Sequence, residues 1–489
     1  MKDKIFRYRG ELLAALSGIL FITIAATWES PIYKGAYGFD ASFFSMMGRA
    51  ILEGKVPYKD YFDIKGPVFF FIEAIGQFIH RDRMGVYIIE CIAAAAAFVY
   101  LYKICQFYKL SVRKTFTVFA VTVFVYITTL WGGNTMEEFM LPFNYAALYY
   151  GLLFLKKRSD DLGVAFFFGI AVSVAVLSKV TTAAPVFAVI LCVICYMLNK
   201  KQIKELLLCA FLFIAGFLVI AVPVVIYFYF RGALADFVNA AFVIAFKRGT
   251  DYYEGFSIKW ESYLIICYVG FITFFTRIKY KGVEKYMLLS LSIVTFLLLH
   301  LGTPFDYYFT TILPLLSFSA ILVCRDVKLL YLISGKQFRY VLNNMILMII
   351  GIVVALMYYN GKTILKLYEC YDIVKTQSEV EVYEYYKEIY SLIPEYEYED
   401  VFCIESGMIL YEVNQVLPQN KYPVNYPYFT ELYPPCKQEV LDKLYKDSPK
   451  WIVSEDMEHF EILEIREFVL DHYIKVTDNP RDELWLKVY

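Results

Sequence analysis

Eleven long apolar stretches lie within the first 358 residues of this 489-residue chain. A helix that crosses a lipid bilayer needs about 20 apolar residues, and each stretch reaches or approaches that length. We expect membrane-spanning helices near residues 11–28, 84–102, 115–131, 140–155, 163–178, 183–198, 206–230, 262–276, 286–300, 308–324 and 340–358. Hydrophobic residues make up 59% of the chain and charged residues 19%, which excludes a disordered, fibrous or nucleic-acid-binding protein. The sequence therefore predicts a mainly α-helical, polytopic membrane protein.

The charges between the stretches indicate which side of the membrane each loop occupies. If the N-terminus is cytoplasmic, the inner segments carry 22 Lys and Arg in 60 residues, whereas the outer loops carry 12 in 105. This excess follows the positive-inside rule. The alternative for the first stretch is a signal peptide, because basic residues precede it and Ala25-Ala26 ends it. We favour an uncleaved first helix, which predicts a multi-pass plasma-membrane protein with its C-terminus outside the cytoplasm.

Residues 359–489 differ in composition from the rest of the chain and form a second predicted domain. Helical patterns are expected at residues 380–392, 438–445 and 458–470, and strand patterns at 401–404, 451–454 and 484–489. This order is typical of a small α/β domain. We therefore expect a transmembrane domain over residues 1–358 and an extracytoplasmic, soluble α/β domain over residues 359–489.

The outer loop 29–83 is too long for a simple connection. Asp40 begins a helical pattern that ends at Gly54, with Phe43 and other apolar residues on one face. The stretch Val68–Ile79 is also apolar, but its 12 residues would extend only about 18 Å as a helix. We expect two helices that lie in the membrane interface.

Ionisable side chains gather at the outer ends of the predicted spans. Such groups are costly at the membrane unless they are paired, solvated or used. A carboxylate can accept a proton from an attacking hydroxyl, and a Lys, an Arg or a divalent metal can hold a leaving phosphate. These residue types predict a reaction on an amphiphile with an anionic head. The candidates are Asp40, Asp60, Asp63, Lys65, Glu137, Glu138, Lys179, Arg248, Asp306 and Tyr307.

Three motifs resemble those of GT-C membrane glycosyltransferases, including bacterial family 39-like protein mannosyltransferases and lipid A aminoarabinose and galacturonic acid transferases. Residues 40–67 look like the first outer loop of these enzymes, residues 133–139 are similar to the second, and residues 307–314 resemble a later His-Tyr-Phe…Leu-Pro element. The resemblance covers roughly residues 1–358. It implies inverting transfer of a sugar from a polyprenyl-phosphate carrier in the membrane to a glycan, lipid or protein acceptor outside the cytoplasm.

The resemblance also implies roles for individual residues. Asp40 matches the catalytic base, and Lys65 matches the lysine that meets the carrier phosphate. The sequence departs from the pattern twice: Ala41 stands where eukaryotic protein mannosyltransferases carry a second acid, and Tyr307 stands in place of the His. The need for a divalent cation, Mg²⁺ or Mn²⁺, therefore stays open.

The other candidates have expected roles around these two. Lys179 or Arg248 would assist in holding the phosphate, and Glu137 or Glu138 would orient the acceptor or help to hold a metal. The remaining candidates, Asp60, Asp63, Asp306 and Tyr307, are expected to contact the substrate.

Each candidate also has a purely structural interpretation. An Asp before a helix is commonly its N-cap, which applies to Asp40. Acids near the start of a helix stabilise it by interacting with the helix dipole, which applies to Glu137 and Glu138. The lysines could reach lipid head groups instead, and Asp60 and Asp63 could be solvated turn residues.

Two other functions fit a polytopic chain of this kind. A transporter or flippase of lipid-linked glycans would carry charged residues inside the spans and broken helices in corresponding halves. Here the predicted spans are nearly free of charge, with Glu90 as one exception. A scaffold without catalytic activity that carries an outer binding domain is the third interpretation.

Overall fold

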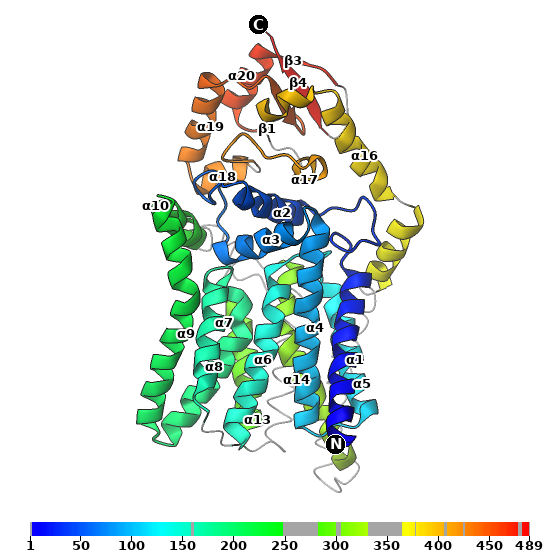
Figure 1. Cartoon of the computed structure of the whole chain (residues 1–489), viewed down its shortest axis with the longest axis vertical. Coiled ribbons are helices and arrows are strands. Elements are labelled where there is room, and N and C mark those ends of the chain that lie inside the picture. The colour runs from blue at the N-terminus through cyan, green and yellow to red at the C-terminus, as the bar shows by residue number, and fades with distance from the viewer. Residues whose placement is uncertain are drawn as a thin grey trace, which may run out of the picture. The chain divides into compact units, whose positions relative to one another are not determined.

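The computed structural model describes residues 2–157, 161–247, 282–299, 305–330, 364–376, 378–404, 408–423, 426–477 and 482–488 (Figure 1). The chain divides into two compact units. The helix unit comprises Met1–Ala26, Ile89–Pro223 and Tyr252–Asp372, and the mixed unit comprises Thr27–Ile88, Val224–Asp251 and Ile373–Tyr489. Two long helices, α4 and α9, continue from one unit into the other.

Apolar sequence without internal turn signals gives the helix unit its long helices. With α4 and α9 included, its elements are α1 (Lys2–Ala25), α4 (Arg83–Phe107), α5 (Val112–Thr129), α6 (Met136–Lys157), α7 (Gly163–Val176), η1 (Val180–Ala183), α8 (Ala184–Asn199), α9 (Ile203–Phe230), α13 (Val283–Leu299), η3 (Asp306–Ile312) and α14 (Leu313–Leu330). Among the described residues, six stretches have the length and apolar composition of a membrane span: Tyr8–Ala25, Arg83–Phe107, Val112–Thr129, Val180–Asn199, Ile203–Phe230 and Asp306–Arg325.

Nine of the eleven predicted spans coincide with helices of this unit. Three of those helices, α6, α7 and α13, are not among the six stretches above. The spans predicted at 262–276 and 340–358, and with them the domain boundary at residue 358, lie outside the described residues. The total of eleven spans stays a prediction.

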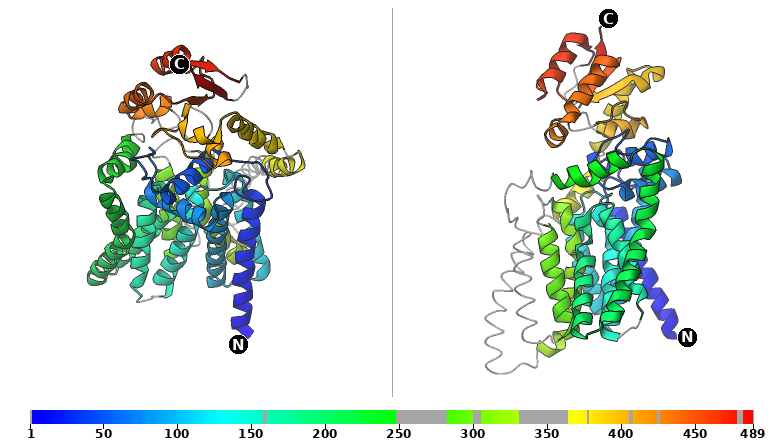
Figure 2. Two further views of the ribbon diagram at one scale, coloured as in Figure 1. Left: turned by 45° about the horizontal axis from the view of Figure 1, so that its top comes forward. Right: turned by 90° about the vertical axis from the view of Figure 1, so that its left-hand side faces the viewer.

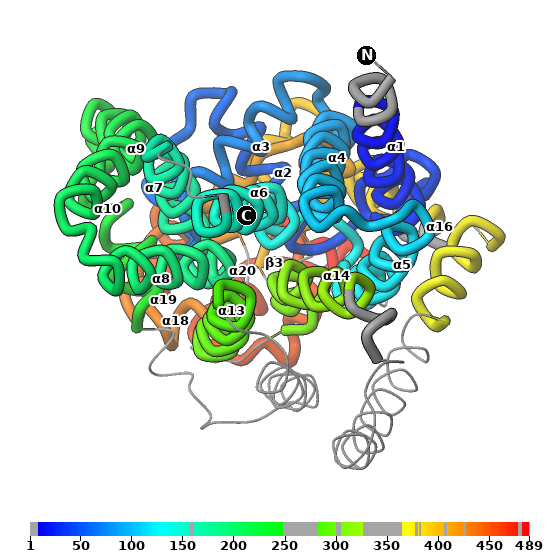
Figure 3. Tube along the Cα trace, turned by 90° about the horizontal axis from the view of Figure 1, so that it is seen from below, coloured from blue at the N-terminus to red at the C-terminus, as the bar shows by residue number. Residues whose placement is uncertain are grey.

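Small residues let helices of this unit approach closely. Figure 3 shows α8 beside α6 and α13, and α5 beside α14, and these pairs are in contact. At the contact of α7 and α9, a Cβ atom on Gly169 would lie 2.0 Å from the carbonyl oxygen of Phe213, and one on Gly216 equally close to that of Phe166. Only glycine fits at either position, as is common where membrane helices pack through small residues.

The mixed unit joins short helices with one small sheet. Its helices are α2 (Phe39–Leu52), α3 (Pro67–Ile79), α10 (Leu234–Val238), the π-helix η2 (Asn239–Ile244), α16 (Ser378–Ser391), η4 (Glu395–Asp400), α17 (Ile409–Asn414), α18 (Tyr426–Leu432), α19 (Pro435–Lys446) and α20 (Leu463–His472). Its strands are β1 (Val401–Ile404), β2 (Trp451–Ser454), β3 (Tyr473–Lys475) and β4 (Glu483–Lys487).

The four strands form one sheet in the order β1-β2-β4-β3, drawn near the C-terminus in Figure 2. Strands β1 and β2 are parallel, with Val401 opposite Trp451, whereas β4 is antiparallel to both β2 and β3. Every residue of β1 and β2 is buried. Strands buried on both faces read as continuous apolar runs, which is why the sequence predicted these two with their observed bounds.

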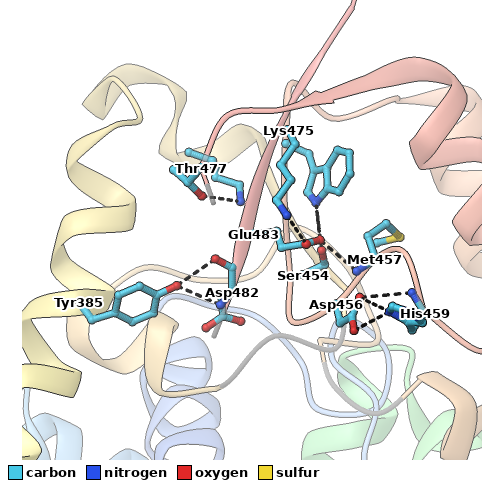
Figure 4. A network of polar contacts seen from close by, with 11 residues as sticks. Tyr385, Ser454, Asp456, Met457, His459, Lys475, Thr477, Asp482 and Glu483 are labelled. Atoms are coloured by element: carbon cyan, nitrogen blue, oxygen red, sulfur yellow. Dashed lines mark hydrogen bonds and ion pairs between the residues drawn. The ribbon is translucent and has the colours of Figure 1, made fainter. Parts of the chain in front are cut away.

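Polar contacts lie at one end of the central strands β2 and β4 (Figure 4). Glu483 accepts hydrogen bonds from the Met457 amide at 3.0 Å and from the Lys475 ammonium at 2.7 Å. Asp456 accepts a bond from the amide of His459 at 3.2 Å. This turn occupies the residues where the sequence predicted the start of a helix, so the prediction of 458–470 was wrong at that end and α20 begins at Leu463.

Helices α2 and α3 pack against each other within the mixed unit (Figure 1). A Cβ atom on Gly48 would lie 2.6 Å from the carbonyl carbon of Glu73, so a larger residue would force the helices apart. The rings of Phe44 and Phe69 meet edge to face at 4.7 Å. Ten of the fourteen residues of α2 are buried. Its polar side chains therefore face protein on most sides, which differs from the one-sided burial expected of a helix on a membrane surface.

Candidate functional site

Asp40 lies in the first turn of α2, at its second residue. The N-cap is Gly38, and no side chain caps the helix, so the N-cap interpretation of Asp40 was wrong. The side chain is half-buried, and no hydrogen bond or ion pair joins its carboxylate to another residue that the structure describes. A carboxylate at this position can accept a proton from an attacking hydroxyl.

Lys65 is held just before the start of α3. Its ammonium forms an ion pair with the Oδ2 atom of Asp63 at 3.3 Å. It also lies 5.0 Å from the ring centre of Phe44 and 5.9 Å from that of Phe43, in cation–π contact with both. The Lys65 side chain keeps 27% of its exposure, whereas that of Asp63 keeps 3%. The ammonium is therefore positioned by its neighbours and still reachable from solvent.

The backbone around Lys65 is fixed by local contacts. The hydroxyl of Tyr58 donates a hydrogen bond to the carbonyl of Lys65 at 2.7 Å. Burial raises the pKa of Tyr58 well above its ordinary value, and the nearby Asp63 carboxylate raises it further, so the hydroxyl stays a donor. Asp63 accepts the Ile64 amide at 2.6 Å. Gly66 and Pro67 then open α3, with Pro at the position where a helix tolerates it best.

The rings of Phe43 and Phe44 place Lys65 on the side of α2 that also carries Asp40. Residues three and four positions apart share one face of an α-helix, so Asp40 lies on the same face of α2 as Phe43 and Phe44. The Lys65 ammonium lies over these two rings. An unpaired carboxylate and a partly exposed ammonium thus occupy the same side of α2.

Asp60 has a different position from the other acids of this segment. Its Oδ2 atom accepts a hydrogen bond from the Val56 amide at 2.6 Å, and its own amide donates to the Val56 carbonyl at 2.9 Å. These bonds close the turn that precedes Tyr61. Asp60 therefore acts as a turn residue in the described structure.

A second group of candidate residues lies in the helix unit. Glu137, in the first turn of α6, pairs with the Lys179 ammonium at 2.5 Å. The same ammonium lies 3.1 Å from the ring centre of Tyr308 and 5.1 Å from that of Tyr307, both in η3. Three candidates that are far apart in the sequence, Glu137, Lys179 and Tyr307, are therefore brought together.

Glu138 lies beside this group and contacts the loop before α6. Its Oε2 atom accepts the Thr135 amide at 2.9 Å, while Glu90 of α4 accepts the neighbouring Asn134 amide at 2.8 Å. Asn134 has a φ of 57°, a left-handed conformation that Asn tolerates better than most residues. The two glutamates hold the loop in place and also interact electrostatically with each other.

Two candidates remain, Asp306 and Arg248. Asp306 is the first residue of η3 and is half-buried. Arg248 lies outside the described residues. Within the described ranges, no group of three or more His, Cys, Asp or Glu side chains is arranged to hold a metal ion.

Sequence reasoning missed several residues that shape these groups. Tyr308 contributes the ring closest to the Lys179 ammonium, although only Tyr307 was selected. The pattern Thr135-x-x-Glu138 could have signalled the contact of Glu138 with the helix start, because Thr followed by Glu three residues later is a capping sequence. No local signal reveals the partners of Arg49, whose guanidinium pairs with Glu412 at 2.9 Å.

A family model for dolichyl-phosphate-mannose-protein mannosyltransferases matches residues 64–227. This segment contains Lys65, Glu137, Glu138 and Lys179 and leaves out Asp40. No curated protein matches the sequence significantly.

Two solved structures are similar to the chain over nearly its whole length. One is ArnT from Cupriavidus metallidurans bound to undecaprenyl phosphate, which is 14% identical with a TM-score of 0.60. The other is the same protein in the apo state, at 13% identity and a TM-score of 0.60. Each alignment covers 98% of this chain and 97% of ArnT. With its apolar helices of membrane length, the chain is a multi-pass membrane protein that has the fold of ArnT and resembles the GT-C membrane glycosyltransferases.

Proposed function

We propose that the chain is a membrane glycosyltransferase that moves a sugar from a polyprenyl-phosphate carrier to an acceptor outside the cytoplasm, with inversion. The proposal rests on one observation: an acid and a cation lie on the same side of α2. There the Asp40 carboxylate has no described partner, and the Lys65 ammonium is held over the adjoining face. The ArnT fold and the family-model match support the reaction class, and ArnT itself binds undecaprenyl phosphate.

The reaction would be a single displacement. The acceptor hydroxyl attacks the anomeric carbon of the sugar, and its proton passes to the Asp40 carboxylate. A new bond forms between the acceptor oxygen and the anomeric carbon as the bond from that carbon to the carrier phosphate breaks. The bonding electrons leave on the phosphate, whose growing charge the Lys65 ammonium stabilises. Attack from the side opposite the leaving phosphate inverts the anomeric carbon.

The other candidates keep supporting roles in this proposal. Lys179 or Arg248 would assist Lys65 with the phosphate, and Glu137 or Glu138 would orient the acceptor or help to hold a divalent cation. Asp60, Asp63, Asp306 and Tyr307 would contact the substrate. The acceptor is a glycan, a lipid or a protein on the outer face of the plasma membrane, where the C-terminal domain would also lie, with the N-terminus in the cytoplasm.

The test uses the purified full chain in lipid nanodiscs. The protein is incubated with undecaprenyl-phosphate-linked sugars and an extract of cell-envelope acceptors, and the release of undecaprenyl phosphate is followed by mass spectrometry. We expect release by the wild type that depends on the acceptor and is lost in Asp40→Asn. A wild type that releases no undecaprenyl phosphate, or that only moves intact lipid-linked sugar across a bilayer, would contradict the proposal and favour a flippase.

A further inference from the structure

Arg49 lies on α2, nine residues after Asp40, and is almost fully buried at 3% exposure. Its guanidinium donates to Glu412 of α17 at 2.9 Å, to the carbonyl of Tyr411 at 3.1 Å and to that of Val416 at 3.2 Å. Three acceptors for one guanidinium, all from residues 411–416, fix its position in several directions at once.

Other side chains complete this contact. The second carboxylate oxygen of Glu412 accepts the hydroxyl of Ser45 at 3.0 Å, and that hydroxyl in turn accepts the side-chain amide of Gln77 at 2.6 Å. Ser45 lies on α2 and Gln77 on α3. The carboxylate of Glu412 is therefore joined to both helices of the segment that carries Asp40 and Lys65, as the adjoining positions of α2, α3 and α17 in Figure 1 illustrate.

The segment just before Lys65 contacts the same part of the chain. The Phe62 amide donates to the carbonyl of Lys421 at 2.7 Å, and the Tyr61 hydroxyl donates to the carbonyl of Pro418 at 2.8 Å. The Phe62 ring stacks on Tyr433 at 5.6 Å. The segment between Asp40 and Lys65 is thus anchored to residues 411–433 within α2 and again just before Lys65.

The energetics of the Arg49–Glu412 pair favour a role in positioning. Burying two charges costs more than their attraction usually returns, and an apolar pair of similar volume is often at least as stable. A buried ion pair with additional hydrogen bonds instead holds its two side chains in one defined geometry. Along a rigid helix with 3.6 residues per turn, fixing the rotation of α2 at Arg49 also fixes the direction of Asp40.

We propose that Arg49 and Glu412 are positioning residues, through which residues 411–416 of the C-terminal part hold the Asp40 carboxylate beside the Lys65 ammonium. The inference rests on the proposed function for its catalytic consequence. It gives the C-terminal part a task in the transfer step itself: without this contact α2 would turn, and the base and the phosphate-binding cation would no longer share one side.

The experiment compares three variants of the full chain in nanodiscs: Arg49→Met, the double variant Arg49→Met/Glu412→Met, and Lys450→Met as the control. The control breaks the ion pair between Lys450 and Glu397, which belongs to the same unit and does not include α2. Thermal unfolding, hydrogen exchange of the amides of residues 39–52, and the kcat and KM for the polyprenyl-phosphate sugar are measured for each.

For Arg49→Met we expect exchange in α2 to rise about tenfold and kcat to fall about a hundredfold, as a small misplacement of a catalytic group can cause. The donor KM should stay within about threefold, because uniform binding is not lost. The double variant removes the unpaired charge and should regain part of the thermal stability, while α2 exchange and kcat stay impaired. The control should change neither α2 exchange nor kcat.

Two results would overturn the inference. One is unchanged hydrogen exchange of α2 in Arg49→Met. The other is a double variant whose kcat recovers together with its stability, since the pair would then only stabilise the fold. A wild type without any transfer activity would refute the proposed function instead, and the exchange of α2 would still decide whether Arg49 and Glu412 position this helix.

Discussion

The two candidate glutamates of the helix unit and Asp40 of the mixed unit are held in different ways. In the helix unit, Glu137 and Glu138 are 1% and 2% exposed, and each has a defined partner, the Lys179 ammonium or the Thr135 amide. In the mixed unit, Asp40 is half-buried and no described residue pairs with it. A buried carboxylate needs its partner to remain in the fold, whereas a half-buried one without a described partner is available to accept a proton. The comparison singles out Asp40 as the acid to test first.

The largest effect is expected from Asp40→Asn. The amide keeps the shape of the side chain and removes its basicity, so turnover should fall by about 10² to 10⁴ while the thermal midpoint of unfolding stays within error. Asp471→Asn is the control, since Asp471 is an exposed acid of the same unit, and it should retain most of its activity. Equal losses in both variants would break the distinction between these acids.

A smaller effect is expected from Lys65→Met. Loss of the ammonium should lower kcat/KM for the lipid donor about a hundredfold, because a fixed charge no longer meets the leaving phosphate. Lys65→Arg keeps the charge and should recover part of the rate. Wild-type kinetics in Lys65→Met would show that the Lys65 ammonium does not meet the donor phosphate.

Lys179→Met tests the buried, paired carboxylate of Glu137 in the helix unit. It leaves the buried Glu137 carboxylate without its cation, which should reduce the free energy of unfolding by about 3 kcal/mol. Thermal unfolding in detergent measures this loss, and Lys204→Met, at an exposed residue of the same unit, serves as the control. A variant that is as stable as the wild type would show that the buried Glu137 carboxylate does not depend on the Lys179 ammonium, and would remove the contrast between the two groups.

The smallest effect is expected at the end of α2. Gly54 has a φ of +85°, and a Cβ atom there would meet nothing within 4 Å. Gly54→Ala should therefore cost only backbone strain, about 1 kcal/mol, with kcat nearly unchanged. Chemical denaturation and the transfer assay test this expectation. A large loss of kcat would mean that α2 transmits small disturbances to Asp40 despite its anchor at Arg49.

Local patterns predicted much of the fold. The helix expected from Asp40 occurs as Phe39–Leu52, because its apolar spacing and the closing Gly54 act over neighbouring residues. The buried strands at 401–404 and 451–454 were likewise found from short apolar runs. The turn at Asp456 was missed because a side chain bonding to the backbone competes with the helix that the apolar spacing suggests.

The candidate site could be predicted only in part. The types of residue in the segment 29–83 indicated an acid and a cation near one another, and the contacts of Lys65 with Phe43 and Phe44 are consistent with it. The anchor between Arg49 and Glu412 joins residues 363 positions apart. No periodicity or turn signal in a single sequence specifies such a contact, because it arises only when the chain is folded.

The most direct measurement compares Asp40→Asn with Glu138→Gln in one single-turnover assay, using the same undecaprenyl-phosphate sugar and correcting each rate for the folded fraction. If Asp40 is the base, and Glu138 holds the loop before α6 and at most orients the acceptor, Glu138→Gln should keep about a tenth or more of the wild-type rate, and Asp40→Asn should be at least about a hundredfold slower than the wild type. The opposite ranking, with Asp40→Asn active and Glu138→Gln inert although folded, would contradict this account.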